Sequence, residues 1–126
     1  MPTFTADELK EIAIDNFERL GVPSEEAEIV ADHLIEASLS GVDSHGVLRI
    51  PQYSEYIRQG RVVSGAKIEI TQDTPSSALV NGNNGFGQIV VKKAMDLAVN
   101  KAKELTISAV SVHNCSHTGR LGSYTV

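Results

Sequence analysis

Residues 77–112, "SALVNGNNGFGQIVVKKAMDLAVNKAKELTISAVSV", decide the fold class of this chain. The opening "SALVNG" is typical of a short strand, and the glycine-rich "GNNGFGQ" of a tight turn. A long amphipathic helix is expected from about Phe86 to Leu105, followed by the buried strand "ISAVSV". Strands that alternate with a helix predict an α/β or α+β class.

Hydrophobic residues at helical spacing predict three helices before this stretch, over residues 5–20, 24–40 and 47–59. Thr5 and Glu8 form a capping-box pattern at the start of the first helix. Pro51 fits the third helix only in its first turn, because proline lacks the N–H that later turns need. Alternating residues from Ala66 to Ile70 predict a half-buried strand.

The composition indicates one ordinary globular domain: 126 residues, 41% hydrophobic and 21% charged. A net charge of −5, with 11 scattered Lys and Arg residues, argues against a nucleic-acid partner. The chain has no apolar run near the ~20 residues of a membrane span, and "MPTFTADELKE" does not resemble a signal peptide. We therefore expect a cytoplasmic protein without a membrane partner, whose lone Cys115 forms no disulfide within the chain.

Two segments concentrate reactive side chains: "DSHGVLRIPQY" at 43–53 and "NCSHTGRLGSY" at 114–124. His45 and His117 each sit beside a glycine, with a hydroxyl residue before and an arginine after. On this chemistry alone, catalytic and structural roles for the two histidines are equally weighted. Arg49 follows His45 by one helical turn, so the pair could present an acid and a carboxylate fork to a small 2-hydroxy or 2-oxo acid.

The glycine-rich turn raises the possibility of a dinucleotide site, since backbone amides at a helix N-terminus bind pyrophosphate. Gly82, Gly85 and Gly87 do not complete the G-x-G-x-x-G pattern, because Val90 occupies the position of the last glycine. A plain tight turn is therefore favoured over a Rossmann site.

The remaining candidate residues favour structural roles. No H-x-x-x-H or C-x-x-C spacing occurs, so no metal site is expected. His33 is expected on the surface of its helix, and His113 is expected to cap or pack before the turn. Cys115 could be a nucleophile activated by His117, but a small side chain that fills a tight corner is favoured.

Taken in order and at their separations, the segments "DSHGVLRIPQY", "NGNNGFGQIVVKKAMDLAVNKAKE" and "VSVHNCSHTGRLGSY" resemble the malate/L-lactate dehydrogenase family that lacks a Rossmann fold. The family includes ureidoglycolate dehydrogenase, sulfolactate dehydrogenase, diketogulonate reductase and a cyclic-imine reductase. The resemblance covers nearly the whole chain from Thr5 and matches the N-terminal part of the family.

The resemblance implies a homodimeric oxidoreductase that uses NAD or NADP and has a sulfolactate-dehydrogenase-like fold of N-terminal helices followed by a mixed sheet. Ser44, His45 and Arg49 match the family's substrate-pocket motif. The motif beside the nicotinamide is matched by His117, Gly119 and Gly122. The implied reaction moves a hydride between the cofactor and a small 2-hydroxy/2-oxo acid such as malate or lactate, with His45 and His117 as candidates for the proton transfer.

The resemblance also divides the chain into a helical part with the substrate motif at 1–62 and the start of a cofactor domain at 63–126. Family members continue well beyond Val126, so the second part is expected to be truncated. The alternative function is a non-catalytic fragment, or a helical interaction module that binds no cofactor by itself.

Overall fold

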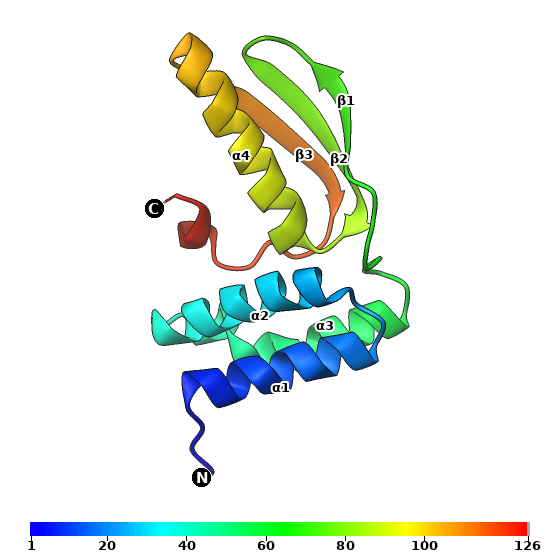
Figure 1. The fold of residues 1–126 in the computed structure, drawn as a ribbon, viewed down its shortest axis with the longest axis vertical. Helices are drawn as coiled ribbons and strands as arrows, with labels where there is room; N and C mark the ends of the chain where they lie inside the picture. The colour runs from blue at the N-terminus through cyan, green and yellow to red at the C-terminus, as the bar shows by residue number, and fades with distance from the viewer. Residues whose placement is uncertain (126) are drawn as a thin grey trace.

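A computed structural model describes residues 1–125 of the chain, and Val126 lies outside the described residues. The order is three helices, two strands, a long helix and a third strand (Figure 1). The helices are α1 (Ala6–Arg19), α2 (Ser24–Leu39), α3 (Ile50–Arg58) and α4 (Gly87–Leu105). The strands are β1 (Glu69–Asp73), β2 (Ser77–Gly85) and β3 (Ala109–Cys115). Short 3-10 turns lie at η1 (Asp43–His45), η2 (Val47–Arg49) and η3 (Leu121–Tyr124).

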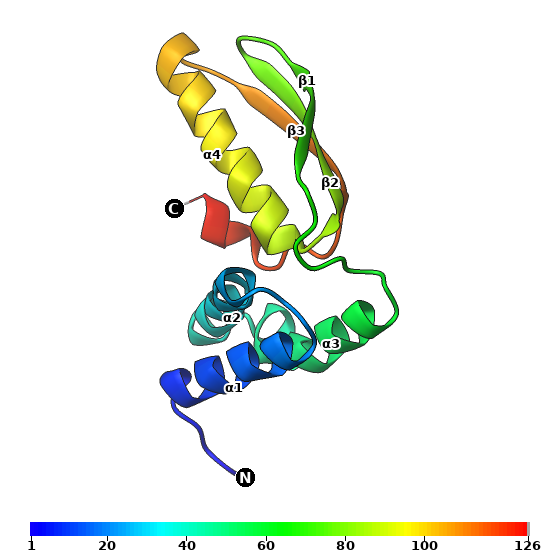
Figure 2. The same ribbon diagram turned by 45° about the vertical axis from the view of Figure 1, so that its right-hand side comes forward.

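The sheet has the order β1-β2-β3 and is mixed. β1 pairs with β2 antiparallel, whereas β2 pairs with β3 in parallel. A parallel pair needs a crossover connection, which α4 supplies while it covers one face of the sheet (Figures 1 and 2). The predicted α/β (α+β) class with a mixed sheet is therefore confirmed.

Helices α1, α2 and α3 form a separate layer against the end of the sheet and α4 (Figure 2). Phe17, Leu34, Tyr53 and Phe86 are the large side chains of their shared core, and Phe86 comes from the turn before α4. Burial of such side chains drives the two layers together. The predicted capping box is present, because Thr5 Oγ1 accepts from the N–H of Glu8 and the Glu8 carboxylate accepts from the N–H of Thr5.

The third predicted helix is divided, contrary to expectation. Residues 47–49 form the 3-10 turn η2, and the α-helix begins only at Ile50. The N–H of Val47 donates to Ser38 Oγ at 3.0 Å, so this segment is tied to α2 before α3 starts. Pro51 lies in the first turn of α3, as predicted.

The first strand also differs from its prediction. It spans 69–73 instead of 66–70, and it is exposed along its whole length, with Ile70 52% exposed. Its pairing with β2 runs to Asp73, next to the connecting turn, which shifts the strand toward that turn. The structure has two cores, one shared by the helical layer and the start of α4, and one between α4 and the sheet around Val80, Val90 and Ala94. The expected half-buried position is wrong because β1 is an edge strand, and Ile68, which packs against both cores, lies just before it.

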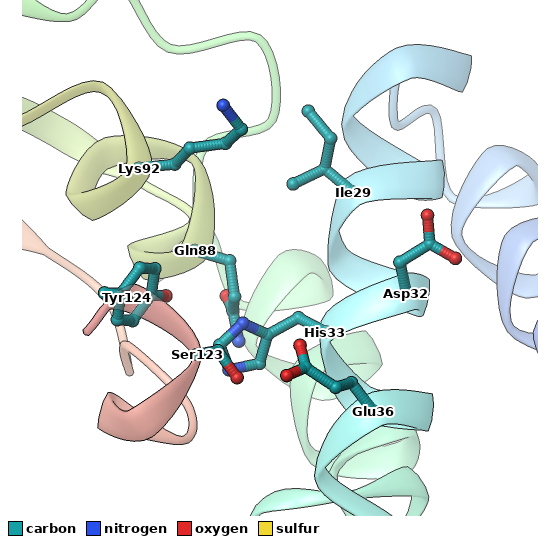
Figure 3. Close-up of a pocket in the computed structure, with 8 residues that line it drawn as sticks. All are labelled: Ile29, Asp32, His33, Glu36, Gln88, Lys92, Ser123 and Tyr124. Carbon is teal, nitrogen blue, oxygen red and sulfur yellow. The ribbon is translucent and has the colours of Figure 1, made fainter. Parts of the chain in front are cut away.

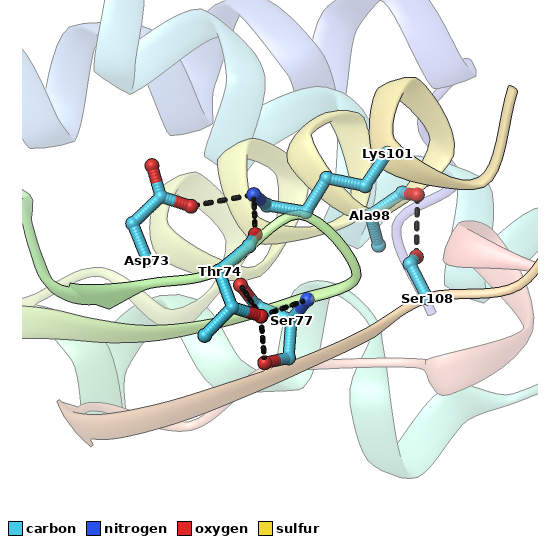
Figure 4. Close-up of polar contacts among 6 residues, drawn as sticks. All are labelled: Asp73, Thr74, Ser77, Ala98, Lys101 and Ser108. Carbon is cyan, nitrogen blue, oxygen red and sulfur yellow. Dashed lines mark hydrogen bonds and ion pairs between the residues drawn. The ribbon is translucent and has the colours of Figure 1, made fainter. Parts of the chain in front are cut away.

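Polar contacts anchor the far end of α4 to the β1–β2 turn (Figure 4). Lys101 Nζ contacts the Asp73 carboxylate and donates to the carbonyl of Thr74 at 2.6 Å. Ser108 Oγ donates to the carbonyl of Ala98, also at 2.6 Å, where the chain leaves α4 for β3. These contacts hold the last turns of α4 against the end of the sheet.

Within residues 1–125, each helix is either too short or too polar to cross a bilayer.

Candidate active site

The two predicted histidines meet at the junction of the layers. His45 ends η1, shortly after α2, and His117 lies in the loop that follows β3. Their ring centroids are 5.3 Å apart with the planes inclined by 33°, and both rings are half-buried. The fold thus brings together two reactive segments that are some 70 residues apart in the sequence.

The segment around His45 is shaped by a close contact with α2. Gly46 is buried, and a Cβ at this position would collide with Ser38 Oγ. Ser44 is exposed, and its Oγ lies 2.8 Å from His45 Nδ1. The free edge of the His45 ring is therefore the one that carries Nε2.

Arg49 is held in place by two contacts within its own segment. Nε donates to the carbonyl of Ser44 at 2.7 Å, and Nη1 donates to Oε1 of Gln52. A guanidinium has five N–H donors, so these contacts leave three, on Nη1 and Nη2, for other partners. His45 and Arg49 do not share a regular helical face as expected, because they lie in two successive 3-10 turns that are interrupted at Gly46.

His117 is held by the buried side chain of Tyr53. The Tyr53 hydroxyl lies 2.8 Å from His117 Nδ1, and Gln88 Nε2 donates to the same hydroxyl at 2.9 Å. Burial lowers the pKa of His117, and the charges of Arg49 and His45 lower it further. Burial also raises the pKa of Tyr53, which keeps the phenol protonated.

His33 is buried, so its predicted surface position is wrong. Its Nε2 accepts a hydrogen bond from the backbone N–H of Arg120 at 2.8 Å, and the Arg120 guanidinium lies 3.3 Å from the Glu36 carboxylate. The acids near His33 in the sequence suggested a solvated face, but the loop after β3 covers this part of α2. Burial lowers the pKa of His33, although the nearby Glu36 opposes the shift.

A pocket of about 270 Å³ opens beside this contact, between α2, α4 and η3 (Figure 3). It combines apolar and charged side chains, and its lining residues are Ile29, Asp32, His33, Glu36, Gln88, Lys92, Ser123 and Tyr124. Figure 3 shows Gln88 extending from α4 toward His33 on α2. The His45 and Arg49 side chains belong to a different part of the junction and do not line this pocket.

Gly119 and Gly122, which match the cofactor motif, and Gly87 at the start of α4 lie against the protein's own atoms. Gly119 has a φ of +76°, and a Cβ there would collide with the His33 ring. A Cβ on Gly122 would lie 3.1 Å from the Arg120 guanidinium, and one on Gly87 would collide with the carbonyls of Ser116 and His117. These glycines therefore leave no open cradle for the phosphates of a cofactor.

The two remaining candidates have structural surroundings. Cys115 is half-buried against the core under the sheet, and burial raises the pKa of its thiol. A raised pKa reduces the thiolate fraction, so the geometry favours the packing role over the nucleophile. The exposed His113 lies within β3 and does not have the packed position expected for it.

The helical layer packed against the end of a mixed sheet is the fold of solved malate and sulfolactate dehydrogenases. The structure superposes on malate dehydrogenase from Pyrococcus horikoshii OT3 with a TM-score of 0.93 at 41% identity, covering 98% of this chain and 35% of that one. The sequence-based expectation of a sulfolactate-dehydrogenase-like, non-Rossmann fold is thereby confirmed.

Sequence comparison identifies the family. The malate/L-lactate dehydrogenase model matches residues 4–126, and the chain belongs to this family. L-sulfolactate dehydrogenase from Methanocaldococcus jannaschii is 40% identical over 115 residues, 91% of this chain and 33% of that protein. Malate dehydrogenase from Pyrococcus abyssi is 44% identical over 118 residues, 94% of this chain and 33% of that protein. The chain therefore spans about a third of the length of these relatives.

Sequence reasoning gave no role to three residues that hold the site. Tyr53 belongs to the first reactive segment, and its place three residues after Ile50 on the apolar side of α3 was a signal of burial. Gln88 follows the glycine-rich turn, and His33 lies within a largely apolar helix. Their partners could not be read from the sequence, because each is at least 35 positions away.

Proposed function

We propose that this chain supplies the substrate side of the active site of an NAD- or NADP-dependent oxidoreductase that interconverts small 2-hydroxy and 2-oxo acids such as malate or lactate. The proximity of His45 to His117, with Arg49 beside them, carries the proposal. The relatives named above are malate and sulfolactate dehydrogenases, which supports an acid of this class. The proposal includes a cytoplasmic homodimer with the helical part at 1–62 and the start of the cofactor domain at 63–126.

Arg49 is proposed to bind the substrate carboxylate. Its side chain is already oriented by Ser44 and Gln52, so little rotamer freedom is lost when a ligand binds. The remaining N–H groups on Nη1 and Nη2 match the two oxygens of a carboxylate. The exposed Ser44 hydroxyl is proposed to hydrogen-bond to the same substrate.

The two histidines are proposed to handle the proton of the substrate hydroxyl, while the bound nicotinamide supplies hydride exchange at the substrate C2. Histidine suits this role because its pKa lies near the working pH. The lowered pKa of His117 keeps its imidazole neutral at pH 7. His117, together with Gly119 and Gly122, is proposed to lie on the cofactor side, and the choice between NAD and NADP stays open.

A chimera tests this assignment. Residues 1–125 would replace the matching third of the Pyrococcus horikoshii malate dehydrogenase, which has the same fold over this length. His45→Asn and His117→Asn are each expected to lower kcat for malate oxidation by about 10²- to 10⁴-fold. His113→Asn, which alters an exposed ring on β3, is the matched control. Full activity in both site variants would refute the proposal.

The second candidate function is that of a non-catalytic fragment or helical interaction module. It is favoured by one observation, that the glycines around His117 pack against the protein's own atoms and leave no open cradle for cofactor phosphates. Titration of the 126-residue chain with NADH and NADPH separates the two candidates. A change in nicotinamide fluorescence that saturates supports cofactor binding by this chain, and its absence supports the second candidate for the isolated chain.

A further inference from the structure

We infer that Tyr53 and Gln88 are positioning residues: they determine which of the two ring nitrogens of His117 carries the proton. The inference rests on the proposed function for its consequence in catalysis, but its geometry stands independently. Three side chains from different parts of the fold form one line of hydrogen bonds. Gln88 lies in the first turn of α4, Tyr53 in α3, and His117 in the loop after β3.

The direction of the hydrogen bonds follows from the donors. Gln88 Nε2 donates to the Tyr53 oxygen, so the single hydroxyl proton of Tyr53 is free to point toward His117 Nδ1. Nδ1 is then an acceptor and carries no proton. The neutral ring consequently carries its proton on Nε2, the nitrogen that is not bonded to Tyr53.

Burial makes this direction energetically significant. Tyr53 is 2% exposed and Gln88 1% exposed, so water cannot replace a lost partner at low cost. A protonated Nδ1 would put a second donor on the Tyr53 oxygen and leave the hydroxyl proton without this acceptor. The arrangement therefore favours the neutral ring, in the same direction as the lowered pKa of His117. The titratable or charged groups that face the ring are His45, Arg49 and Tyr53, and the charge of His117 also acts on His33.

The opposite direction requires Gln88 to turn its amide. Among residues 1–125, Gln88 Oε1 is the buried side-chain polar atom without a partner. If that oxygen accepted from the phenol, Tyr53 could accept from a protonated Nδ1, and Nε2 would become a bare base. In the inferred arrangement, His117 would instead offer the N–H of Nε2 to a bound 2-oxo acid. It becomes a proton acceptor at Nε2 only when the line of hydrogen bonds reverses.

His33 provides an internal control for the tautomer. Its Nε2 accepts from the backbone N–H of Arg120, so its neutral ring must carry the proton on Nδ1. The same chain is thus expected to contain both histidine tautomers, each set by a single hydrogen-bond donor. His33 also reports whether the loop that carries His117 is docked, because that bond joins the loop to α2.

Nitrogen NMR of the histidine rings tests the inference on the 13.5 kDa chain without cofactor or substrate. At a pH where the rings are neutral, His117 is expected as the Nε2–H tautomer and His33 as the Nδ1–H tautomer. Tyr53→Phe is expected to lower the ratio of Nε2–H to Nδ1–H at His117 by about three- to tenfold. It should also raise the pKa of His117 by about one pH unit at most, because the lost bond stabilised only the neutral ring.

Tyr56→Phe is the matched control, since the Tyr56 hydroxyl accepts from Gln52 and does not contact His117. An Nδ1–H tautomer at His117 in the wild-type chain would overturn the inference. So would an unchanged tautomer ratio in Tyr53→Phe while the His33 signal shows a docked loop. Should that variant lose the His33 signal, Gln88→Met keeps the phenol and decides the matter: a lower ratio supports the inference, and an unchanged ratio refutes it.

In the chimera, Tyr53→Phe is expected to move the limb of the kcat/KM profile that follows the titration of His117 toward higher pH, by the same amount as the His117 pKa. An unmoved limb would refute the link to catalysis. The outcomes are separable from those of the proposed function. An inactive chimera with the expected tautomers would refute only the dehydrogenase proposal, whereas an active one with Nδ1–H at His117 would refute only the role of Tyr53 and Gln88.

Discussion

His33 Nε2 accepts the backbone N–H of Arg120 at 2.8 Å, and this bond joins positions 87 apart in the chain. Protonation of Nε2 would replace an attractive contact between acceptor and donor by a repulsive one between two donors. The geometry therefore requires a neutral His33, and the burial that lowers its pKa acts in the same sense.

This bond predicts how stability depends on pH. The pKa of His33 in the folded chain lies below its ordinary value of 6.5. Between these two pKa values, the unfolded chain therefore binds more protons than the folded chain. The contribution of neutral His33 to the unfolding free energy is complete above about pH 6.5 and is lost as the pH falls through the pKa of His33 in the folded chain. His33→Gln keeps a hydrogen-bond acceptor but does not titrate. Between pH 7 and 5, the unfolding free energy of this variant is therefore expected to fall by about 1 kcal/mol less than that of the unmodified chain. Urea unfolding of both proteins at several pH values measures this difference.

The exposed His113 supplies the control for that experiment. His113→Gln is expected to leave the pH dependence of the unfolding free energy close to that of the unmodified chain, since its ring lies exposed on β3. The same fall in stability in His33→Gln as in the unmodified chain would contradict a role for the Arg120 contact.

Gly119 is predicted to be intolerant of a side chain for two separate reasons. Its φ of +76° is strained for other residues, and its Cβ would meet the His33 ring. Gly41 has a nearly identical φ of +75° but open space around it, so it isolates the first reason. We expect Gly41→Ala to cost about 1 kcal/mol of unfolding free energy and Gly119→Ala about 3 kcal/mol or more. Equal losses in the two variants would show that the His33 contact contributes nothing.

Arg49→Lys tests the carboxylate contact. Lysine keeps the charge but loses the planar set of donors, and a charge-assisted contact of this kind is worth about 1.5–3 kcal/mol. In the chimera, kcat/KM for a 2-oxo acid should fall about ten- to a hundredfold, while that for the uncharged amide changes little. Equal discrimination between acid and amide before and after the substitution would remove Arg49 from the substrate site.

Cys115 is predicted to react slowly. Burial raises the pKa of its thiol, so less thiolate is present at pH 7.4 than in the unfolded chain. Alkylation by iodoacetamide should be about tenfold slower in the folded chain, and His117→Asn should not change the rate. A marked slowing caused by that substitution would instead revive the nucleophile activated by His117.

The fold was predictable where a local pattern coincides with the tertiary need. The helix that ends at Leu105 and the capping box at Thr5 depend on neighbours in the sequence and appear as expected. The tight turn expected at 82–88 is wrong, because β2 continues through it to Gly85 with an irregular register. The buried strand expected at 107–112 is instead β3 at Ala109–Cys115, which is only partly buried. The first strand was misplaced by three residues, because its ends are set by pairing with β2 and not by its own alternation. The surface position expected for His33 was wrong for a similar reason. The acidic neighbours of His33 indicate an exposed helix face, but they give no information on the loop that covers it.

The candidate site divides in the same way. Ser44, His45, Arg49 and His117 could be picked out as reactive residues beside glycines, and the structure places the two rings together. Their roles in catalysis stay predictions. Tyr53 and Gln88 could not be recognised as site residues from the sequence, because their hydrogen-bond partners come from other elements of the fold.

The loop after β3 is held to the helical layer by contacts between residues 64 to 87 positions apart. Closing loops of this length costs more chain entropy than forming a local helix. We therefore expect these contacts to form late in folding and to open first. Opening of residues 116–125 would separate His117 from His45 while both cores stay packed. The amide proton of Arg120 should then exchange with solvent faster than those in the middle of α2, and the paired histidines would be lost on warming before the helices melt.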